Sequence, residues 1–255
     1  MGYLLSIIRM ILMIIWIIII VGIGAPLYIF KITTVNFGFK LRTIFCKVAI
    51  FILGIKIFKT GQLYKHEQTL YVGNHRSLVD PVAIFAYITS GYAVSKAEVE
   101  SYPLIGAGAK MSGVIFVRRD DKGSRKNARE SIVNALLKKY SIVLFPEGTI
   151  SRERKTLTFK KGAFESAVET QSTIVPFAME YHSPSKDFWL NDNILIQFIR
   201  TFSKLRTGIS IHFFDPMNSD DAMQLTLDCE KLINDKINAW QEQYWSEEEL
   251  IKFDV

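Results

Sequence analysis

The stretch TLYVGNHRSLVDPVAIFAYIT, residues 69–89, joins an apolar run to a short helical pattern through a polar loop. Its first residues are β-branched or aromatic and predict a strand. Asp80 followed by Pro81 is a favourable helix start, with aspartate as the N-cap and proline at the first helical position. The stretch therefore predicts one strand–loop–helix unit, with His75 in its loop.

The same alternation of short apolar runs and helical patterns continues to the end of the chain. Strands are predicted at TLYVGN, YAVS, GVIFV, IVLF, IVPFAME, ILIQF and ISIHFF. Helices are predicted at about residues 81–89, 125–139, 161–170 and 220–245. Ser219 is the expected N-cap of the last one. This alternation predicts an α/β fold with a mixed, largely parallel sheet flanked by helices, in which ligands bind where loops leave the strand ends.

The N-terminal segment is a predicted membrane anchor. No charged residue occurs between Arg9 and Lys31, and the run IWIIIIVGIG lies within this segment. As a helix the segment would be about 30 Å long, which is the thickness of a bilayer core. A cleaved signal peptide would have a shorter apolar region, so a retained anchor is favoured. The basic residues that follow favour a cytoplasmic position for the rest of the chain.

A second apolar segment, at about residues 37–58, carries interleaved basic residues. It is predicted as an interfacial or partly inserted helix whose lysine side chains extend to the headgroups. The two segments form either a hairpin in one leaflet or one full span followed by a surface helix. We therefore expect membrane-anchoring helices in residues 1–60 and an α/β domain in residues 61–255.

Composition narrows the class of partner. The 255-residue chain has a formal net charge of +6, which suits anionic partners such as a membrane surface or phosphate groups. No motif of a nucleic-acid-binding module occurs, so no nucleic-acid partner is expected. Cys46 and Cys229 have no metal-like spacing, and we expect neither a disulfide framework nor a bound metal or cofactor.

His75 and Asp80 are the candidate catalytic pair. A turn between strand and helix can bring the two side chains into contact. Asp80 would then accept a hydrogen bond from one imidazole nitrogen and leave the other as a general base. Because no serine accompanies the pair, the nucleophile would be a substrate hydroxyl. The structural alternative is an aspartate that only caps the helix and a histidine that bonds a backbone carbonyl.

The loop FPEGTISR, residues 145–152, is a candidate anion site. Gly148 permits a tight turn with exposed backbone N–H groups, which can bind an anion. Glu147 could orient acceptor hydroxyls or hold a nearby basic side chain. The alternative is a simple β-turn followed by a solvated basic segment.

A second basic position follows the predicted strand GVIFV. The strand ends in Arg118 and Arg119, and arginine suits bidentate recognition of phosphate. Alternatively, the two arginines form salt bridges with Asp120 and Asp121. One of the two arginines can bind phosphate while the other forms the salt bridge.

Taken together and in this order, these motifs resemble the lysophosphatidic acid acyltransferase family, also called the 1-acyl-glycerol-3-phosphate acyltransferases. The resemblance covers roughly residues 65–185. It rests on NHRSLVD (74–80), GVIFVRR (113–119), FPEGTIS (145–151) and IVPF (174–177), with connecting segments SKAEVESYPLIG (95–106) and FKKGAF (159–164).

The resemblance implies a glycerolipid acyltransferase fold behind an N-terminal two-helix membrane motif, with His75 and Asp80 as catalytic residues. It implies transfer of an acyl chain from acyl-CoA or acyl carrier protein to the free sn-2 hydroxyl of lysophosphatidic acid, giving phosphatidic acid. Backbone N–H groups near Gly148 are candidate donors to the oxyanion. The residues expected to bind substrate are Arg119, Glu147, Gly148, Thr149, Arg152 and Lys96.

One position departs from the family pattern. Many members have arginine directly after the threonine, where this chain has Ile150, and we expect Arg152 and Lys96 to supply charge instead. The departure leaves open another lyso-lipid acceptor or, more distantly, glycerol 3-phosphate. Outside this enzyme class, the alternative is a non-enzymatic membrane lipid-binding protein. A secreted hydrolase is disfavoured because no Gly-x-Ser-x-Gly motif is present.

Overall fold

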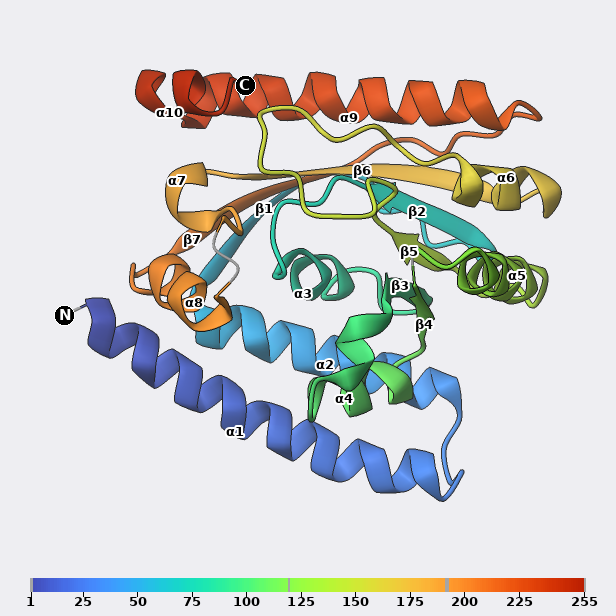
Figure 1. Ribbon diagram of the computed structural model, residues 1–255, viewed down its shortest axis with the longest axis horizontal. Coiled ribbons are helices and arrows are strands. Elements are labelled where there is room, and N and C mark those ends of the chain that lie inside the picture. The colour runs from blue at the N-terminus through green and yellow to red at the C-terminus, as the bar shows by residue number, and fades with distance from the viewer. Residues whose placement is uncertain (1, 119, 191–192, 255) are drawn as a thin grey trace.

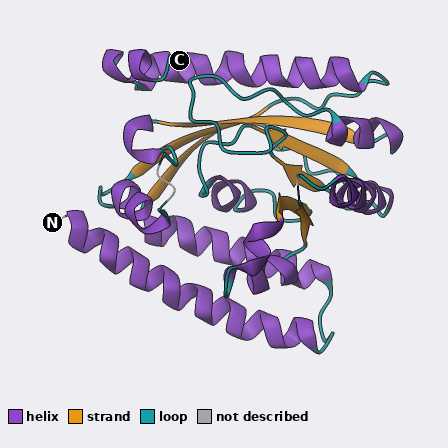
Figure 2. Cartoon of the chain, viewed as in Figure 1, coloured by secondary structure: helices purple, strands orange, loops and turns teal. Residues whose placement is uncertain are grey.

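A computed structural model describes residues 2–118, 120–190 and 193–254 and has a sheet between layers of helices (Figures 1 and 2). Within the described residues the sheet has seven strands, in the order β1-β7-β6-β2-β5-β3-β4. Neighbouring strands are parallel except for β6 and β7, so the predicted mixed, largely parallel sheet is confirmed. The strands are β1 (Ile55–Gly61), β2 (Thr69–Gly73), β3 (Tyr92–Lys96), β4 (Val114–Val117), β5 (Ile142–Leu144), β6 (Thr173–Tyr181) and β7 (Thr207–Phe213).

The helices divide between the two faces of the sheet. One apolar cluster joins the sheet to α5, α6 and α9, and the other joins it to α2 and α3. The α-helices are α1 (Gly2–Ile29), α2 (Val35–Leu53), α3 (Asp80–Phe85), α4 (Ile105–Met111), α5 (Lys122–Leu137), α6 (Gly162–Glu169), α7 (Pro184–Asp187), α8 (Ile194–Phe202), α9 (Ala222–Tyr244) and α10 (Glu247–Lys252), and the 3-10 helix η1 spans Ala97–Ser101.

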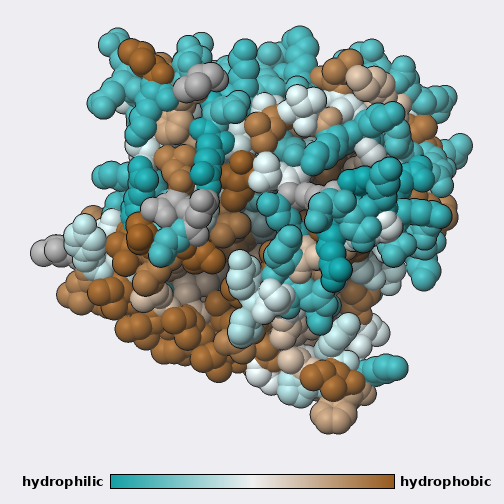
Figure 3. All heavy atoms as spheres, viewed as in Figure 1, coloured by the Kyte–Doolittle hydropathy of each residue, from teal (hydrophilic) through white to brown (hydrophobic). Residues whose placement is uncertain are grey.

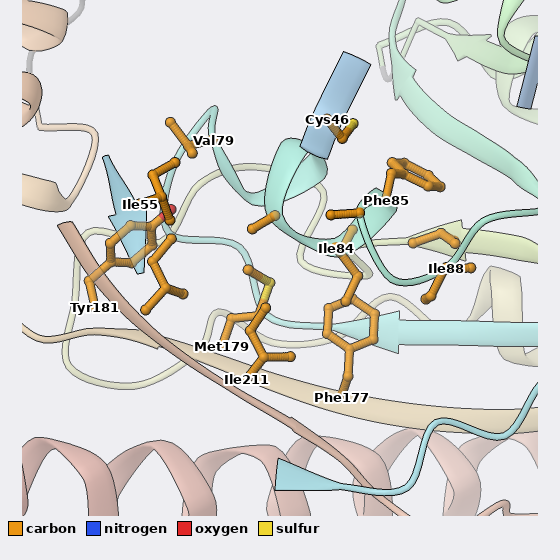
Figure 4. Packing of buried hydrophobic residues seen from close by; sticks show 14 of the residues in the cluster. Cys46, Ile55, Val79, Ile84, Phe85, Ile88, Phe177, Met179, Tyr181 and Ile211 are labelled. Carbon is orange, nitrogen blue, oxygen red and sulfur yellow. The ribbon is translucent and has the colours of Figure 1, made fainter. Parts of the chain in front are cut away.

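Strand β2 lies in the middle of the sheet and is covered on both faces. All five of its residues are buried, and consecutive side chains alternate between the two clusters. Leu70 and Val72 pack with the α5–α6–α9 side, whereas Tyr71 packs with the α2–α3 side. Ile84 of α3 and Phe177 of β6 belong to the second cluster (Figure 4). The strand is therefore fixed from both faces, and the loop that follows it has a rigid base.

The segment ILIQF was predicted as a strand, and that prediction is wrong: it begins α8. The Asn193 side chain accepts hydrogen bonds from the N–H groups of Leu195 and Ile196, which satisfies two donors of the first helical turn. A short apolar run fits either a strand or a helix, and here the cap decides.

The predicted helix at residues 37–58 is too long. Helix α2 ends at Leu53 because Gly54 adopts the left-handed conformation, φ 68°, and its N–H bonds the carbonyls of Ile50 and Phe51. The following residues form β1, which pairs with β7 along its whole length. The predicted boundary at residue 60 therefore falls at the end of a strand that belongs to the sheet.

The last long helix begins slightly later than predicted. Asp221, not Ser219, is the N-cap of α9, and its carboxylate accepts from the N–H groups of Met223 and Gln224. The Ser219 hydroxyl accepts from the Asp221 N–H, so it supports the cap from outside the helix.

Helix α1 is the one described helix that is long and apolar enough to cross a membrane. It lies along α2, α4 and α8 rather than projecting away from the domain (Figure 1). The Trp16 indole donates to the Phe45 carbonyl, and Gly24 lies against Met111 and Leu41.

Candidate active site

The loop after β2 is fastened to the neighbouring strand before the candidate catalytic residues begin. The Asn74 amide donates to the Met179 carbonyl and accepts from the Met179 N–H, both at 2.8 Å. Because Met179 lies in β6, this pair of bonds ties the end of β2 to its neighbour. His75 therefore leaves the sheet from a fixed point.

His75 and Asp80 are in contact, as the spacing predicted. His75 Nδ1 lies 2.8 Å from Asp80 Oδ2, and the Asp80 side chain is fully buried. The other carboxylate oxygen accepts from the Tyr181 hydroxyl at 2.6 Å. Burial and the neighbouring Asp80 charge raise the pKa of Tyr181 well above its usual value, so the hydroxyl keeps its proton and acts as a donor.

Asp80 does not cap α3 in the predicted way. It is the first helical residue and Val79 is the N-cap, while the Asp80 carboxylate points back into the loop. There its Oδ2 atom accepts from the backbone N–H groups of Arg76 and Ser77, at 2.6 and 2.8 Å. The carboxylate thus holds the loop backbone and the histidine ring together, which favours a bond from Nδ1–H and leaves Nε2 as the basic nitrogen.

The FPEG loop forms the other wall of the site. The Phe145 ring stacks on the His75 ring, with centroids 4.3 Å apart and planes 12° from parallel. The Glu147 carboxylate accepts from the His75 N–H at 2.6 Å and from the Leu157 N–H at 2.8 Å. In return, the Ser151 N–H donates to the His75 carbonyl at 2.8 Å. The two loops therefore position each other around His75.

Burial raises the pKa of Glu147 to about 7, and the hydrogen bonds from Leu157 and His75 and the Arg76 charge oppose this rise. The side chain is almost fully buried and is directed at backbone N–H groups. These contacts give Glu147 a role in holding the His75 loop. Its predicted role in substrate binding stays a prediction.

Arg76 is a further residue of the site. Its side chain is fully buried and spans from the His75 loop to the segment after FPEG. The guanidinium donates to the carbonyls of Glu153, Arg154 and Lys155 at 2.5, 2.7 and 3.1 Å. It also bonds Glu180 at 3.2 Å. Gln241 of α9 donates to the same carboxylate, so Arg76 and Glu180 connect the His75 loop to α9.

Lys96, which was predicted to bind substrate, and Arg118 lie at the same edge of the sheet as His75. Pairing places four residues in one row across adjacent strands: Tyr71, Val143, Ala93 and Val114. His75, Glu147 and Arg118 each follow this row by four residues on their own strands, and Lys96 follows it by three. Since these strands are parallel, all four positions leave the sheet at its carboxyl edge.

The remaining predicted positions surround the FPEG turn. Gly148 has a φ of 79°, and a Cβ there would lie 2.6 Å from the Lys160 ammonium nitrogen. Thr149 and Arg152 are exposed. The Gly148 N–H donates to the Phe145 carbonyl at 3.0 Å, so the turn itself uses this predicted oxyanion donor. Arg119 lies outside the described residues, and its predicted phosphate contact stays a prediction.

The sequence interpretation missed Tyr181, Arg76 and Phe145 as parts of the site. Tyr181 is distant in sequence and becomes a neighbour of Asp80 only through strand pairing of β6 with β2. Arg76 lay within the motif that was noticed, but its burial follows from the tertiary path of residues 153–155. Phe145 could have been recognised as part of the site from the sequence, because it is an aromatic residue directly before the Pro-Glu-Gly turn.

A model of the Acyltransferase family matches residues 55–180, from the first residue of β1 to the penultimate residue of β6. The matched range contains the His75 loop and the FPEG loop. Residues 55–180 of the chain belong to the acyltransferase family. The acyltransferase domain therefore includes most of the sheet and the His75–Asp80 pair, whereas Tyr181 and α9 lie outside it.

The chain is similar to curated 1-acyl-sn-glycerol-3-phosphate acyltransferases. It is 27% identical to the protein of Cocos nucifera over 177 residues, 69% of this chain and 54% of the relative. It is 30% identical to the protein of Borreliella burgdorferi over 136 residues, 52% of this chain and 54% of the relative. These similarities confirm the resemblance that the motifs predicted.

A second group of relatives has a different name. The chain is 30% identical over 128 residues to the lyso-ornithine lipid O-acyltransferase of Brucella abortus, 50% of this chain and 48% of the relative. The chain spans about half the length of the curated relatives it matches.

The 1-acyl-sn-glycerophosphate (LPA) acyltransferase of Thermotoga maritima has the same fold. The TM-score is 0.71 at 19% sequence identity, with 95% of this chain and 100% of that chain covered. The similarity extends beyond the acyltransferase domain to the N-terminal helices and the C-terminal part of the chain.

Proposed function

We propose that the protein transfers an acyl chain from a thioester to the free hydroxyl of a lysophospholipid, with lysophosphatidic acid as the preferred acceptor and phosphatidic acid as the product. The observation that carries the proposal is the His75–Asp80 pair, in which a buried carboxylate holds Nδ1 and leaves Nε2 as a base. The 1-acyl-sn-glycerol-3-phosphate acyltransferases among its relatives support the choice of acceptor.

In the proposed reaction, His75 Nε2 takes the proton of the acceptor hydroxyl as its oxygen attacks the thioester carbonyl. The tetrahedral intermediate collapses by breaking the carbon–sulfur bond, and the proton on His75 passes to the departing thiolate. The products are the new ester and a free thiol. Asp80 stabilises the imidazolium that forms between these steps, because its carboxylate bonds Nδ1–H throughout.

The acceptor phosphate is proposed to lie at the carboxyl edge of the sheet, against Arg119, Arg152 and Lys96. Arg118 and Lys96 follow the ends of adjacent strands at this edge, which supports a basic surface there. Lys160, whose ammonium lies over Gly148, adds positive charge beside the FPEG turn. Either acyl-CoA or acyl carrier protein could supply the thioester.

We further propose that α1 attaches the protein to a membrane through one leaflet, with the acyltransferase domain on the cytoplasmic side. Two faces of the helix support this arrangement. The outer face exposes residues such as Ile11 and Ile15, whereas the inner face is held by the Arg9 guanidinium, which bonds the carbonyls of Phe202, Lys204 and Leu205. A helix fixed along the domain in this way suits the interfacial position better than a free span.

The test is a panel of acceptors with labelled acyl-CoA and, separately, labelled acyl carrier protein. The panel contains lysophosphatidic acid, lyso-ornithine lipid, a zwitterionic lysophospholipid and glycerol 3-phosphate. The proposal expects the highest kcat/KM with lysophosphatidic acid. Preference for lyso-ornithine lipid would favour the second group of relatives and refute the phosphate acceptor. Binding of lipid without transfer to any acceptor would refute the enzyme.

A further inference from the structure

Helix α8 exposes apolar side chains on the surface and buries polar ones. Its polar residues Gln197 and Thr201 are fully buried, as is Phe202 near its end, whereas Ile194, Leu195 and Ile196 in its first turn are exposed by 48%, 50% and 53%. A surface helix in water normally has the opposite arrangement, because burying apolar groups is favourable and polar groups are hydrated at little cost.

The buried polar groups of α8 explain its orientation. The Gln197 amide donates to the Phe188 carbonyl at 2.9 Å and to the Thr201 hydroxyl at 3.0 Å, and it accepts from the Leu190 N–H at 3.1 Å. The Thr201 hydroxyl donates to the Lys186 carbonyl at 2.9 Å. These bonds prevent the helix from rotating its apolar side inward, so that side stays on the surface.

The apolar side of α8 is continuous with α1. Arg9 donates to the carbonyls of Phe202, Lys204 and Leu205, which closes the C-terminal end of α8 against the N-terminal third of α1. Figure 3 shows the resulting apolar surface, which runs along α1 and continues over the region of α8. Leu205, between Lys204 and Arg206, extends this surface with 81% exposure.

We propose that the exposed side of α8 together with Leu205 is a second membrane-contacting element, which dips into the headgroup region of the leaflet that holds α1. The proposal rests on the membrane attachment proposed for α1. A lipid surface fits this patch better than a second copy of the chain, because the patch continues the exposed apolar side of α1 and the exposed Arg206 adjoins its most exposed leucine, as in interfacial segments that bind anionic lipids.

The contact gives the acceptor lipid a short route to the active site. The segment that leads into α8 touches the catalytic loop directly, since the Trp189 N–H donates to the Arg76 carbonyl at 3.2 Å. Leu190 in the same segment bonds Gln197 of α8. A leaflet that holds α8 therefore lies near His75, and a lyso-lipid can reach the site without leaving the interface.

The test uses a polarity-sensitive fluorophore on single introduced cysteines in the full chain. Leu195→Cys and Leu205→Cys report on the proposed contact, Ile11→Cys reports on α1, and Leu137→Cys is the matched control on the opposite side of the domain. Leu137 is 61% exposed at the end of α5. The native Cys46 and Cys229 are buried, and burial raises the pKa of each thiol to about 12, so both react slowly.

The labelled proteins are reconstituted into vesicles of zwitterionic and anionic phospholipid that carry nitroxide groups near the headgroups. The expected result is a blue-shifted emission and at least about twofold quenching at positions 195, 205 and 11, with neither change at 137. Quenching at 11 but not at 195 or 205 would overturn the proposal. Blue-shifted emission at 195 without nitroxide quenching, in a protein of doubled mass, would assign the patch to a second copy. Because the readout needs no turnover, its failure is distinct from failure of acyl transfer.

Discussion

The Tyr181 hydroxyl donates to the Asp80 oxygen that does not face His75, and under the proposed mechanism it positions the catalytic pair. We predict that Tyr181→Phe lowers kcat about tenfold, equivalent to about 1.4 kcal/mol, with KM little changed, because one carboxylate oxygen loses its donor and the histidine is held less well. Steady-state kinetics with varied acceptor check this.

Tyr71→Phe is the matched control. Tyr71 is also a buried tyrosine of the sheet, and its hydroxyl donates to the Tyr64 carbonyl at the same distance, 2.6 Å. Both variants should lose a similar amount of stability. Equal kcat in the two variants would show that the Tyr181 contact is merely structural.

Glu147 makes stability depend on pH. Its pKa is about 7 in the folded chain against an ordinary value of 4.5. Between these values the folded chain binds more protons than the unfolded chain, so the free energy of unfolding falls as pH rises through this window, by about 3 kcal/mol for the full shift. We predict that Glu147→Gln removes this component, as measured by urea denaturation at pH 5 and pH 8.

The same substitution removes an acceptor, because an amide has one carbonyl oxygen for the two N–H groups of His75 and Leu157. Glu147→Gln should therefore be less stable than wild type at pH 5, by about 1 kcal/mol, and more stable than wild type at pH 8, because wild type loses most of the about 3 kcal/mol over this range and the variant does not. Buried Asp187, whose burial raises its pKa to about 6, titrates alike in both proteins. A constant difference between the two proteins at all pH values would contradict this assignment.

At the scale of elements, Arg76 joins the catalytic loop to β6 and α9. We predict that Arg76→Met destabilises the fold by about 3–5 kcal/mol, because the buried Glu180 keeps Gln241 but loses its cation. Burial already raises the pKa of Glu180. The double variant Arg76→Met, Glu180→Gln should recover part of the loss, and urea denaturation measures it. Strictly additive losses would show that the two side chains are not coupled.

The elements near the catalytic loop could be predicted because local signals agreed there. The β2–loop–α3 unit combined a β-branched run, a polar loop and an Asp-Pro start, and all three favoured the same structure. Residues 194–198 are apolar except for Gln197, and so short an apolar run does not separate a buried strand from a helix whose apolar side faces outward. Strand β1 was hidden because its residues continue the apolar pattern of α2, and only Gly54 marks the break.

The partners of the site were less predictable than the site itself. The contact of His75 with Asp80 follows from a short loop, whereas the contact of Asp80 with Tyr181 depends on the position of β6 beside β2. The buried path of Arg76 depends on the segment 153–155 and on α9, which no local pattern specifies.

At the scale of the whole molecule, the N-terminal helices fit the domain through close backbone packing. A Cβ on Gly38 of α2 would lie 1.9 Å from the Met111 carbonyl oxygen of α4, whereas one on Gly22 of α1 would meet nothing within 4 Å. We predict that Gly38→Ala lowers the melting temperature clearly, because the clash outweighs a helix-propensity gain of about 1 kcal/mol. Gly22→Ala should be neutral or slightly stabilising.

Thermal unfolding in the same detergent compares the two glycine variants directly. Equal melting temperatures would mean that α2 and α4 separate at no cost, and that the N-terminal helices are only loosely attached. The predicted difference would instead show that the N-terminal helices and the sheet domain form one packed body, with the His75 loop at a fixed position relative to α1.

The most direct test of the account is acyl transfer from labelled acyl-CoA to lysophosphatidic acid by wild type and His75→Ala in parallel. The account predicts labelled phosphatidic acid with wild type and a loss of at least about a hundredfold in kcat with the variant, as expected for a missing general base. The fold should survive, because His75 lies in a loop and its side chain is partly exposed. Substantial transfer by a folded His75→Ala protein would contradict the assignment of the base and, with it, the proposed mechanism.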